Sequence, residues 1–308
     1  MTCDPKNNCT EYLKGLAEKR AQYASFDNEE KITWCSGCGN MGIQNALKRA
    51  FSFEGLGVKD LLLCYDIGCN GNGSDKMGTY SLHGLHGRII SAAAGAAVAN
   101  TNLKVIAIAG DGGTMSEGIN HLVHAVRNDY PVLFVLHNNQ NYGLTTGQAS
   151  ATTRKGYAMN GSPDGVTTEP MNPSEFALGL EPSFVARTFS GDMKHMTKIF
   201  REALNHKGFA FVEVMQVCPT YNKATPSKWF WDRLKFVEDI EGYNSADLEM
   251  AREAAHDMND SLAMGILYRD PTMPSFMERL KSREGLETSI LVDEVKHYDV
   301  SGFLEELQ

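Results

Sequence analysis

The chain has 308 residues, of which 42% are hydrophobic, so it can bury a large core as one domain with an extension or as two small domains. Its formal net charge of −9, its isoelectric point near 5.5 and its lack of long lysine or arginine runs argue against a nucleic-acid-binding protein. No stretch reaches the roughly 18 consecutive apolar residues of a membrane span, and the polar N-terminus lacks the apolar core of a signal peptide, so we expect a cytoplasmic protein with no membrane contact.

The first 31 residues are polar, and we expect them to form a leader with one short helix at about 12–23. Cys3 and Cys9 lie in this leader and are interpreted as incidental thiols, because chain termini are poorly ordered unless they dock. Seven cysteines in a cytosolic chain favour metal ligands or small buried side chains over disulfides.

A Cys-x-x-Cys pair follows the leader. Cys35 and Cys38 precede an amphipathic helix expected at Met41–Phe51, and the pair suits a redox dithiol, half of a zinc site or half of an iron–sulfur site. The redox dithiol is the least favoured of the three, because a thioredoxin-like site also needs its own strand–helix–strand context.

Two further cysteines follow predicted strands. The apolar run Leu61–Tyr65 predicts a buried strand, in which Cys64 is expected to be a core thiol, whereas Cys69 lies just past its end among glycines. A strand expected at Phe209–Val217 ends at Cys218, which a proline follows. Four cysteines thus lie in loops beside a glycine or a proline: Cys35, Cys38, Cys69 and Cys218. Four thiolates suit either a 4Fe-4S cluster or a tetrahedral zinc ion, and physical reasoning alone leaves both open.

One stretch of the chain combines strand, turn and helix signals. Buried strands are predicted at Val105–Ala109 and Val132–Leu136, with a helix from about Thr114 to Asn128 between them. A strand–helix–parallel strand unit places the turn after its first strand beside the end of its second, at the edge where open α/β sheets bind ligands. We therefore expect Asp111 and Asn139 to be neighbours in space.

These neighbours suit a metal ion and an anion. The Asp111 carboxylate, the Asn139 amide oxygen and a nearby backbone carbonyl form an oxygen ligand set for Mg²⁺. Free N–H groups at Gly112 and Gly113, at the start of a helix, suit a diphosphate. The alternative is a plain strand-to-helix turn in which Asp111 is the N-cap residue.

The rest of the chain alternates strands and helices and then becomes more charged. The expected elements are a long ordered loop at 149–183, a strand at Val185–Phe189, a helix at Met193–Asn205 and surface helices at 246–268 and 273–282. We predict a doubly wound, mostly parallel α/β sheet with a helical C-terminal extension. The expected division is a leader at 1–31, a central domain at 32–228 and the extension at 229–308.

Several motifs resemble those of one family. Gly-Asp-Gly, followed by 25 residues (113–137) and then Asn-Asn, resembles the thiamine-diphosphate signature. The continuation Asn-Tyr-Gly-Leu-Thr-Thr-Gly-Gln resembles the version found in 2-oxoacid:ferredoxin oxidoreductases. The motifs Trp-Cys-x-Gly-Cys-Gly and Ile-Gly-Cys, and the late cysteine before Thr-Tyr-Asn, are similar to the cluster ligands in the thiamine-binding β subunit of those enzymes. The likeness covers about residues 32–232 and implies the same fold.

The resemblance also implies site residues. It assigns Mg²⁺ to Asp111, the side chain of Asn139 and the backbone carbonyl of Asn141. It assigns one 4Fe-4S cluster to the four loop cysteines, Cys35, Cys38, Cys69 and Cys218. The residues implied to bind the cofactors are Cys35, Gly37, His83, Gly110, Asp111, Gly112, Gly113, Asn139, Asn141, Gly143, Leu144 and Thr145. His83, the first histidine of His-Gly-Leu-His-Gly-Arg, is also the expected catalytic contact, and the alternative is a structural histidine at a helix start. Many relatives carry an acidic residue where Gly113 stands, so this turn is expected to differ in detail.

In function, the resemblance implies the β subunit of an enzyme that decarboxylates a 2-oxoacid, passes electrons through the cluster to ferredoxin and transfers the acyl group to coenzyme A. It implies a partner α subunit, in an αβ or (αβ)₂ assembly, that supplies the glutamate for the aminopyrimidine ring. Glu117 is expected to be a solvated or helix-start carboxylate instead. Pyruvate, 2-oxoglutarate and other 2-oxoacids stay open as substrates, with a lean toward 2-oxoglutarate. The alternatives are a non-redox thiamine-dependent decarboxylase or synthase with structural zinc, and a non-catalytic assembly subunit.

Overall fold

The computed structural model describes residues 9–281, 290, 293 and 299–306. Over these residues, eight strands form a single sheet in the order β2-β1-β3-β4-β6-β5-β8-β7. The strands are β1 (Leu61–Tyr65), β2 (Tyr80–His83), β3 (Lys104–Gly110), β4 (Val132–Asn138), β5 (Phe184–Phe189), β6 (Ala210–Met215), β7 (Leu234–Phe236) and β8 (Leu262–Arg269). The predicted α/β sheet is confirmed.

Strand direction divides the sheet into two parts. The six strands from β2 to β5 in this order pair in parallel, so their carboxyl ends lie at one edge. The last two strands run the other way, because β8 pairs antiparallel with β5 and β7 pairs parallel with β8. The candidate site described below lies at the carboxyl edge of the parallel part.

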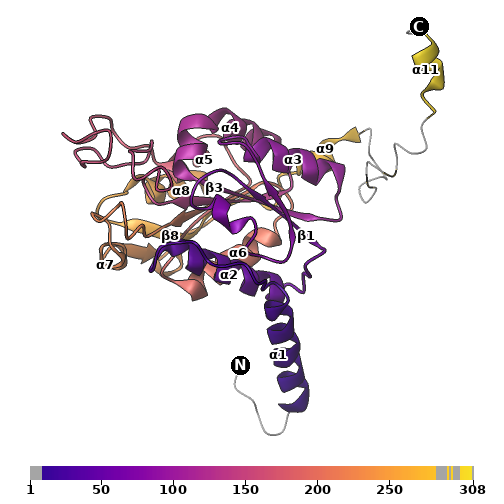
Figure 1. The fold of residues 1–308 in the computed structure, drawn as a ribbon, viewed down its shortest axis with the longest axis horizontal. Coiled ribbons are helices and arrows are strands. Elements are labelled where there is room, and N and C mark those ends of the chain that lie inside the picture. The colour runs from indigo at the N-terminus through magenta and orange to yellow at the C-terminus, as the bar shows by residue number, and fades with distance from the viewer. Residues whose placement is uncertain (1–8, 282–289, 291–292, 294–298, 307–308) are drawn as a thin grey trace.

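Helices cover both faces of the sheet (Figure 1). One face carries α2 (Gly39–Phe53) and α6 (Met193–Leu204), and α1 (Cys9–Ala24) packs on α2. The other face carries α3 (Ile89–Ala99), α4 (Ile119–Asn128), α5 (Pro173–Leu178) and α8 (Leu248–His256). The short elements are η1 (Gly71–Gly73), η2 (Gly112–Glu117), α7 (Ser227–Trp231), η3 (Val237–Asp239), α9 (Phe276–Arg279) and α11 (Ser301–Glu305). No helix of the described residues is long and apolar enough to cross a membrane.

The helix predicted from Thr114 to Asn128 consists of two pieces. A π-helical turn, η2, is followed at Gly118 by the regular helix α4. A Cβ atom on Gly118 would lie 2.4 Å from the carbonyl oxygen of Gly87, so the chain passes too close to the Gly87 turn for a larger residue. The other strands and helices predicted up to residue 217 lie within a few residues of those observed. The loop predicted at 149–183 is wrong over its last third, because it contains the helix α5, which begins at Pro173 and is capped by the Asn172 side chain.

The helix predicted at 246–268 is wrong in its second half. Helix α8 ends at His256, and Leu262–Arg269 form the strand β8. Gly265 has φ of 127°, which a helix does not allow. A short apolar run suits a strand and a buried helix equally, and pairing with β5 decides between them here. The edge strand β2, which is exposed along its length, was not predicted either.

The C-terminal extension is therefore less helical than predicted, since β7 and β8 extend the main sheet. The helix predicted at 273–282 is present only as α9, and residue 282 lies outside the described residues, as does Cys3 of the leader. The division into 1–31, 32–228 and 229–308 stays a prediction.

Phe134 on β4 provides a test of the core. Its side chain is fully buried, and its ring lies 6.0 Å from that of Phe209 and 5.7 Å from that of Phe211, between centroids. Phe134→Ala is expected to lower the free energy of unfolding by about 3–5 kcal/mol, because a large cavity forms. The matched control Phe303→Ala, at a ring that is 71% exposed, should cost about 0.5 kcal/mol or less. If denaturant unfolding showed the same loss of unfolding free energy in both variants, Phe134 would not act as a core residue.

Candidate cofactor and cluster site

A cavity of about 460 Å³ opens at the carboxyl edge of the parallel strands. Its walls come from the loops that follow β1, β3 and β4. Nine of the residues expected to bind cofactors line it: Gly110, Asp111, Gly112, Gly113, Asn139, Asn141, Gly143, Leu144 and Thr145. We call it the edge cavity. The fold therefore brings most of the predicted cofactor residues to one place.

Asp111 lies at the base of this cavity and is almost completely buried. Its carboxylate accepts hydrogen bonds from Ser150 Oγ at 2.5 Å and Thr152 Oγ1 at 2.6 Å, and another from the backbone N–H of Asn139. Burial raises the pKa of the Asp111 carboxyl to about 6, against the opposing effect of these hydrogen bonds. The expected proximity of Asp111 and Asn139 is confirmed.

Asn139 and Asn141 form hydrogen bonds with each other. The backbone N–H of Asn141 donates to Asn139 Oδ1 at 3.1 Å, and the Asn141 side chain donates to the Asn139 carbonyl oxygen at 2.9 Å. Asn222, from the loop after β6, donates to the same carbonyl at 3.1 Å. A buried carboxyl beside amide and carbonyl oxygens fits a hard cation such as Mg²⁺, which would offset the cost of ionising Asp111 in the protein interior.

The turn after β3 accepts only glycine at two positions. A Cβ atom on Gly112 would lie 2.3 Å from the ring of Tyr142, and one on Gly113 would lie 2.1 Å from Asp66 Oδ2. An acidic side chain at position 113 would therefore collide with the Asp66 carboxyl, which accounts for the glycine at this point of the motif. Both glycines line the edge cavity, and backbone N–H groups at the start of a helix suit a diphosphate.

Asp66 is a buried carboxyl that the sequence did not identify as important. Its Oδ1 accepts from the backbone N–H of Gly87 at 2.8 Å, and its Oδ2 has no hydrogen-bond partner among the residues that the structure describes. Burial raises the pKa of Asp66, and the nearby His86 opposes that shift.

The histidine that lines the edge cavity is His86 and not His83. Nδ1 of His86 lies 2.5 Å from Glu117 Oε2, so a carboxylate accepts from one ring nitrogen. Glu117, which was expected to be solvated or to start a helix, also lines the cavity, and its side chain is 44% exposed. His83 ends the exposed strand β2, next to Gly71, and its role as a cofactor or catalytic contact stays a prediction.

The four predicted cluster cysteines lie near enough to one another for their charges to interact, but they are not gathered closely enough to form a metal-binding group. Burial, and then the charges of Cys38, Cys218 and Cys35, raise the pKa of Cys69 to about 12. Burial also raises the pKa of Cys38, and the charges of Cys218 and Cys35 act in the same direction. Such thiols stay protonated near neutral pH, so a metal centre that binds them must displace their protons. For Cys38 and Cys69, bound iron ions would supply the positive charge that offsets the burial of the thiolates.

Hydrogen bonds fix the loops that carry these cysteines. Trp34 Nε1 donates to the carbonyl oxygen of Cys69 at 2.6 Å, and the N–H of Gly39 donates to the carbonyl oxygen of Val217 at 3.1 Å. The loop before α2 is thereby joined to the ends of β1 and β6. Among the residues that the structure describes, no group of three or more histidine, cysteine, aspartate or glutamate side chains lies close enough to hold a metal ion.

Cys64 differs from this set, as expected. It lies within β1, is fully buried in the core, and burial alone raises the pKa of its thiol to about 12. Cys69, in contrast, lines the edge cavity, and its Sγ would be 3.2 Å from a Cβ atom on Gly143. The cysteine group and the edge cavity therefore share a wall.

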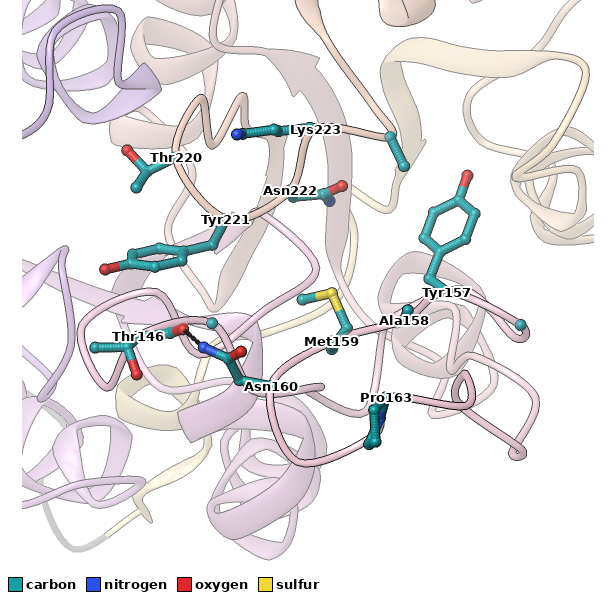
Figure 2. Close-up of a pocket in the computed structure, with 13 residues that line it drawn as sticks. Thr146, Tyr157, Ala158, Met159, Asn160, Pro163, Thr220, Tyr221, Asn222 and Lys223 are labelled. Carbon is teal, nitrogen blue, oxygen red and sulfur yellow. Dashed lines mark hydrogen bonds between the residues drawn. The ribbon is translucent and has the colours of Figure 1, made fainter.

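A second cavity, of about 630 Å³, lies beside the Cys218 loop. Figure 2 shows Tyr221 and Lys223 on one side of it and Met159 and Asn160 on the other. The Asn160 side chain donates to the carbonyl oxygen of Thr146. The long loop predicted at 149–183 thus forms a wall of this cavity, and none of the predicted cofactor residues lines it.

Several residues of the edge cavity carried no recognisable signal in the sequence. Ser150 and Thr152 contact Asp111 from about 40 positions away, in a stretch that reads as an ordinary polar loop. His86 had a signal, since it is the second histidine of the motif that contains His83. The motif was recognised, and its second histidine lines the cavity, whereas the role predicted for His83 stays a prediction.

Two family descriptions match this chain. "Thiamine pyrophosphate enzyme, C-terminal TPP binding domain" matches residues 66–214, which include β3, β4, all but the last residue of β6 and every residue that lines the edge cavity. The description of the C-terminal part of the pyruvate ferredoxin oxidoreductase β chain matches residues 218–284, from Cys218 through β8 to α9.

Individual relatives agree with these descriptions. The chain is 33% identical over 260 residues to the 2-oxoacid:ferredoxin oxidoreductase subunit beta of a Sulfolobus species, a match that covers 81% of this chain and 85% of the relative. It is 30% identical over 249 residues to the 2-oxoglutarate synthase subunit KorB of Methanocaldococcus jannaschii, with 80% and 90% covered. In structure it is similar to a chain of a 2-oxoglutarate:ferredoxin oxidoreductase from Magnetococcus marinus, solved with 2-oxoglutarate, coenzyme A and succinyl-CoA bound. That comparison has a TM-score of 0.84 and 31% identity, and covers 93% of this chain and 96% of the other. The chain therefore belongs to the family of 2-oxoacid:ferredoxin oxidoreductase β subunits.

Proposed function

We propose that this chain is the thiamine-diphosphate-binding β subunit of a 2-oxoacid:ferredoxin oxidoreductase and that it holds one 4Fe-4S cluster. The observation that carries the proposal is the position of Cys69 in the wall of the edge cavity. Cys69 belongs to the group of four cysteines and also lines the cavity that contains Asp111 and Asn139. A cofactor in the cavity and a cluster on the cysteines would therefore lie side by side, as electron transfer between them requires.

The residues of the edge cavity have separate roles in this proposal. Asp111, the Asn139 side chain and the Asn141 backbone carbonyl hold Mg²⁺, and the N–H groups of Gly112 and Gly113 orient the diphosphate. Thiamine diphosphate, when bound, supplies the electron sink for cleavage of the bond between the carboxyl and carbonyl carbons.

The cysteines have a different role. Cys35, Cys38, Cys69 and Cys218 would hold the cluster, which would supply one-electron transfer toward ferredoxin when bound. Coenzyme A accepts the acyl group. The proposed substrate is 2-oxoglutarate or pyruvate, and the names of the Methanocaldococcus and Magnetococcus relatives favour 2-oxoglutarate.

We also propose that the chain works with an α subunit, as the name of the Sulfolobus relative implies for that protein. None of the glutamates in this sequence lies in a recognisable motif for activating the aminopyrimidine ring, so the partner would supply that carboxylate. An αβ or (αβ)₂ assembly in the cytoplasm follows from this proposal.

The cluster is tested on anaerobically purified protein, co-expressed with the α subunit. An absorption spectrum and iron, sulfide and zinc analyses are made on the same sample. We expect a brown protein that absorbs broadly near about 400 nm and contains iron and sulfide in equal amounts. A colourless, zinc-loaded protein would overturn the electron path and favour a non-redox thiamine enzyme. Absence of thiamine diphosphate binding with the partner present would favour an assembly subunit.

Asp111→Ala tests the cofactor site. The substitution removes the only carboxylate proposed to bind Mg²⁺, so Mg²⁺-dependent binding of thiamine diphosphate should be lost in titration calorimetry. Iron content should be unchanged, because the cysteines are not altered, and this serves as the folding control. Unchanged affinity for thiamine diphosphate would refute the assignment of Mg²⁺ to Asp111.

A matched pair of cysteine variants tests the cluster assignment. Cys69→Ser should lose iron, because a proposed ligand is removed, whereas Cys64→Ser should keep it, because Cys64 lies in the core within β1. Iron and sulfide per chain are measured for both variants. The opposite pattern would show that Cys64 is the ligand.

A further inference from the structure

A set of buried polar side chains runs from the edge cavity into the middle of the sheet. We call it the inner polar chain, and its members in order are Thr152, Asn138, Glu213 and Arg187. Each of the four is at most 2% exposed. Its outer end contacts Asp111 and its inner end lies between β6 and β5.

The outer links involve Asp111 directly. Thr152 Oγ1 lies 2.6 Å from Asp111 Oδ2 and 3.1 Å from Asn138 Oδ1, so its single proton is shared between two acceptors. Asn138 immediately precedes Asn139 in the sequence, and the N–H of Asn139 donates to the Asp111 carboxylate. Asn138 is therefore linked to Asp111 in two ways, by its side chain through Thr152 and by its backbone through the N–H of Asn139.

The inner links anchor Asn138. Its Nδ2 donates to Glu213 Oε1 at 2.7 Å, while Glu213 Oε2 accepts from Arg187 Nε at 2.9 Å. Arg187 and Glu213 are directly opposite each other in the register of β5 and β6, and both side chains are 0% exposed. Ser174 Oγ also donates to Glu213 Oε2, so the orientation of the carboxylate is fixed on both of its oxygens.

Stability alone does not account for this ion pair. Removing two charges from water usually costs as much as their attraction returns, so well-packed apolar side chains would serve the core at least as well. Arg187 Nη1, moreover, has no hydrogen-bond partner within the described part of the chain, which adds a further cost. The pair does provide a fixed, charged hydrogen-bond partner for Asn138, the residue before Asn139.

We propose that the inner polar chain positions Asp111 and Asn139 to bind Mg²⁺. The inference rests on the proposed function, because it takes these two residues as the metal ligands. The four members are positioning residues: none of them is assigned as a ligand, and they act by setting where the ligand oxygens lie.

A double variant, Arg187→Met with Glu213→Leu, separates positioning from stability. Replacing the whole buried pair by apolar side chains should leave the protein folded, with a modest loss of stability because the Asn138 amide and the Ser174 hydroxyl lose their acceptor. The Mg²⁺ concentration that gives half-maximal thiamine diphosphate binding should nevertheless rise by about tenfold or more, as is typical when the residues that orient metal ligands are lost. Binding is measured by calorimetric titration on the full chain, co-purified with its α subunit.

Asn138→Ala interrupts the inner polar chain at a second point. It tests the positioning role independently if the double variant does not fold. It should raise the half-saturating Mg²⁺ concentration to a similar degree. Combining all three substitutions should add little more, because the chain is already broken.

The matched control is Asp129→Asn. Asp129 is also a buried carboxyl with hydrogen bonds, from Ser183 Oγ at 2.5 Å and the N–H of Phe209 at 2.8 Å, but it lies at the opposite edge of the sheet, before β4. This variant should lose stability and keep the Mg²⁺ dependence of the wild type.

The outcomes separate the two proposals. If the wild type binds thiamine diphosphate without any dependence on Mg²⁺, the metal assignment fails and this inference fails with it. If the wild type shows the dependence and the folded variants show it unchanged, only the positioning role is overturned. The positioning role is supported if the half-saturating Mg²⁺ concentration rises in both inner-chain variants and does not rise in the Asp129→Asn control.

Discussion

The parallel pairing of β1, β3, β4 and β6 is the constraint on which the candidate site depends. Because these strands run in the same direction, their carboxyl ends meet at one edge of the sheet. Each end leads into a different part of the site: Cys69 follows β1, Asp111 follows β3, Asn139 follows β4 and Cys218 follows β6. The proposed metal ligands and the predicted cluster cysteines therefore lie at the same edge although they come from distant parts of the chain.

Burial sets the electrostatics of this edge. Asp111 and Asp66 are carboxyls with raised pKa values, because the protein interior disfavours their charged forms. The hydroxyls of Ser150 and Thr152 offset part of that cost at Asp111. The remaining cost is what a bound cation would offset, so the base of the cavity is complementary to positive charge. The same logic applies to the thiols of Cys38 and Cys69, whose pKa values are also raised.

Most of the alternating strands and helices up to residue 217 could be predicted, because long apolar runs and helical periodicity are local signals, whereas the short elements β2 and α5 give no such signal. The proximity of Asp111 and Asn139 also followed, since a strand–helix–parallel strand unit has one handedness and one ligand-binding edge. The strand β8 could not be predicted, because its apolar run suits a helix equally well until β5 pairs with it. The contact between His86 and Glu117 was missed for a related reason: it depends on how two turns approach each other and not on the spacing of the residues.

The sequence by itself determined the class of fold, the family resemblance and the types of ligand, because glycine turns, oxygen-bearing side chains and cysteines at strand ends are local features. Only the tertiary structure decided which of these residues meet. It placed Cys69 in the wall of the edge cavity and Asp66 against Gly113. It also placed the ion pair of Arg187 and Glu213 next to Asn138, at the end of β4. The physical reason is that such contacts join residues from separate strands, and their geometry is set by strand order and register, which no local pattern in the chain contains.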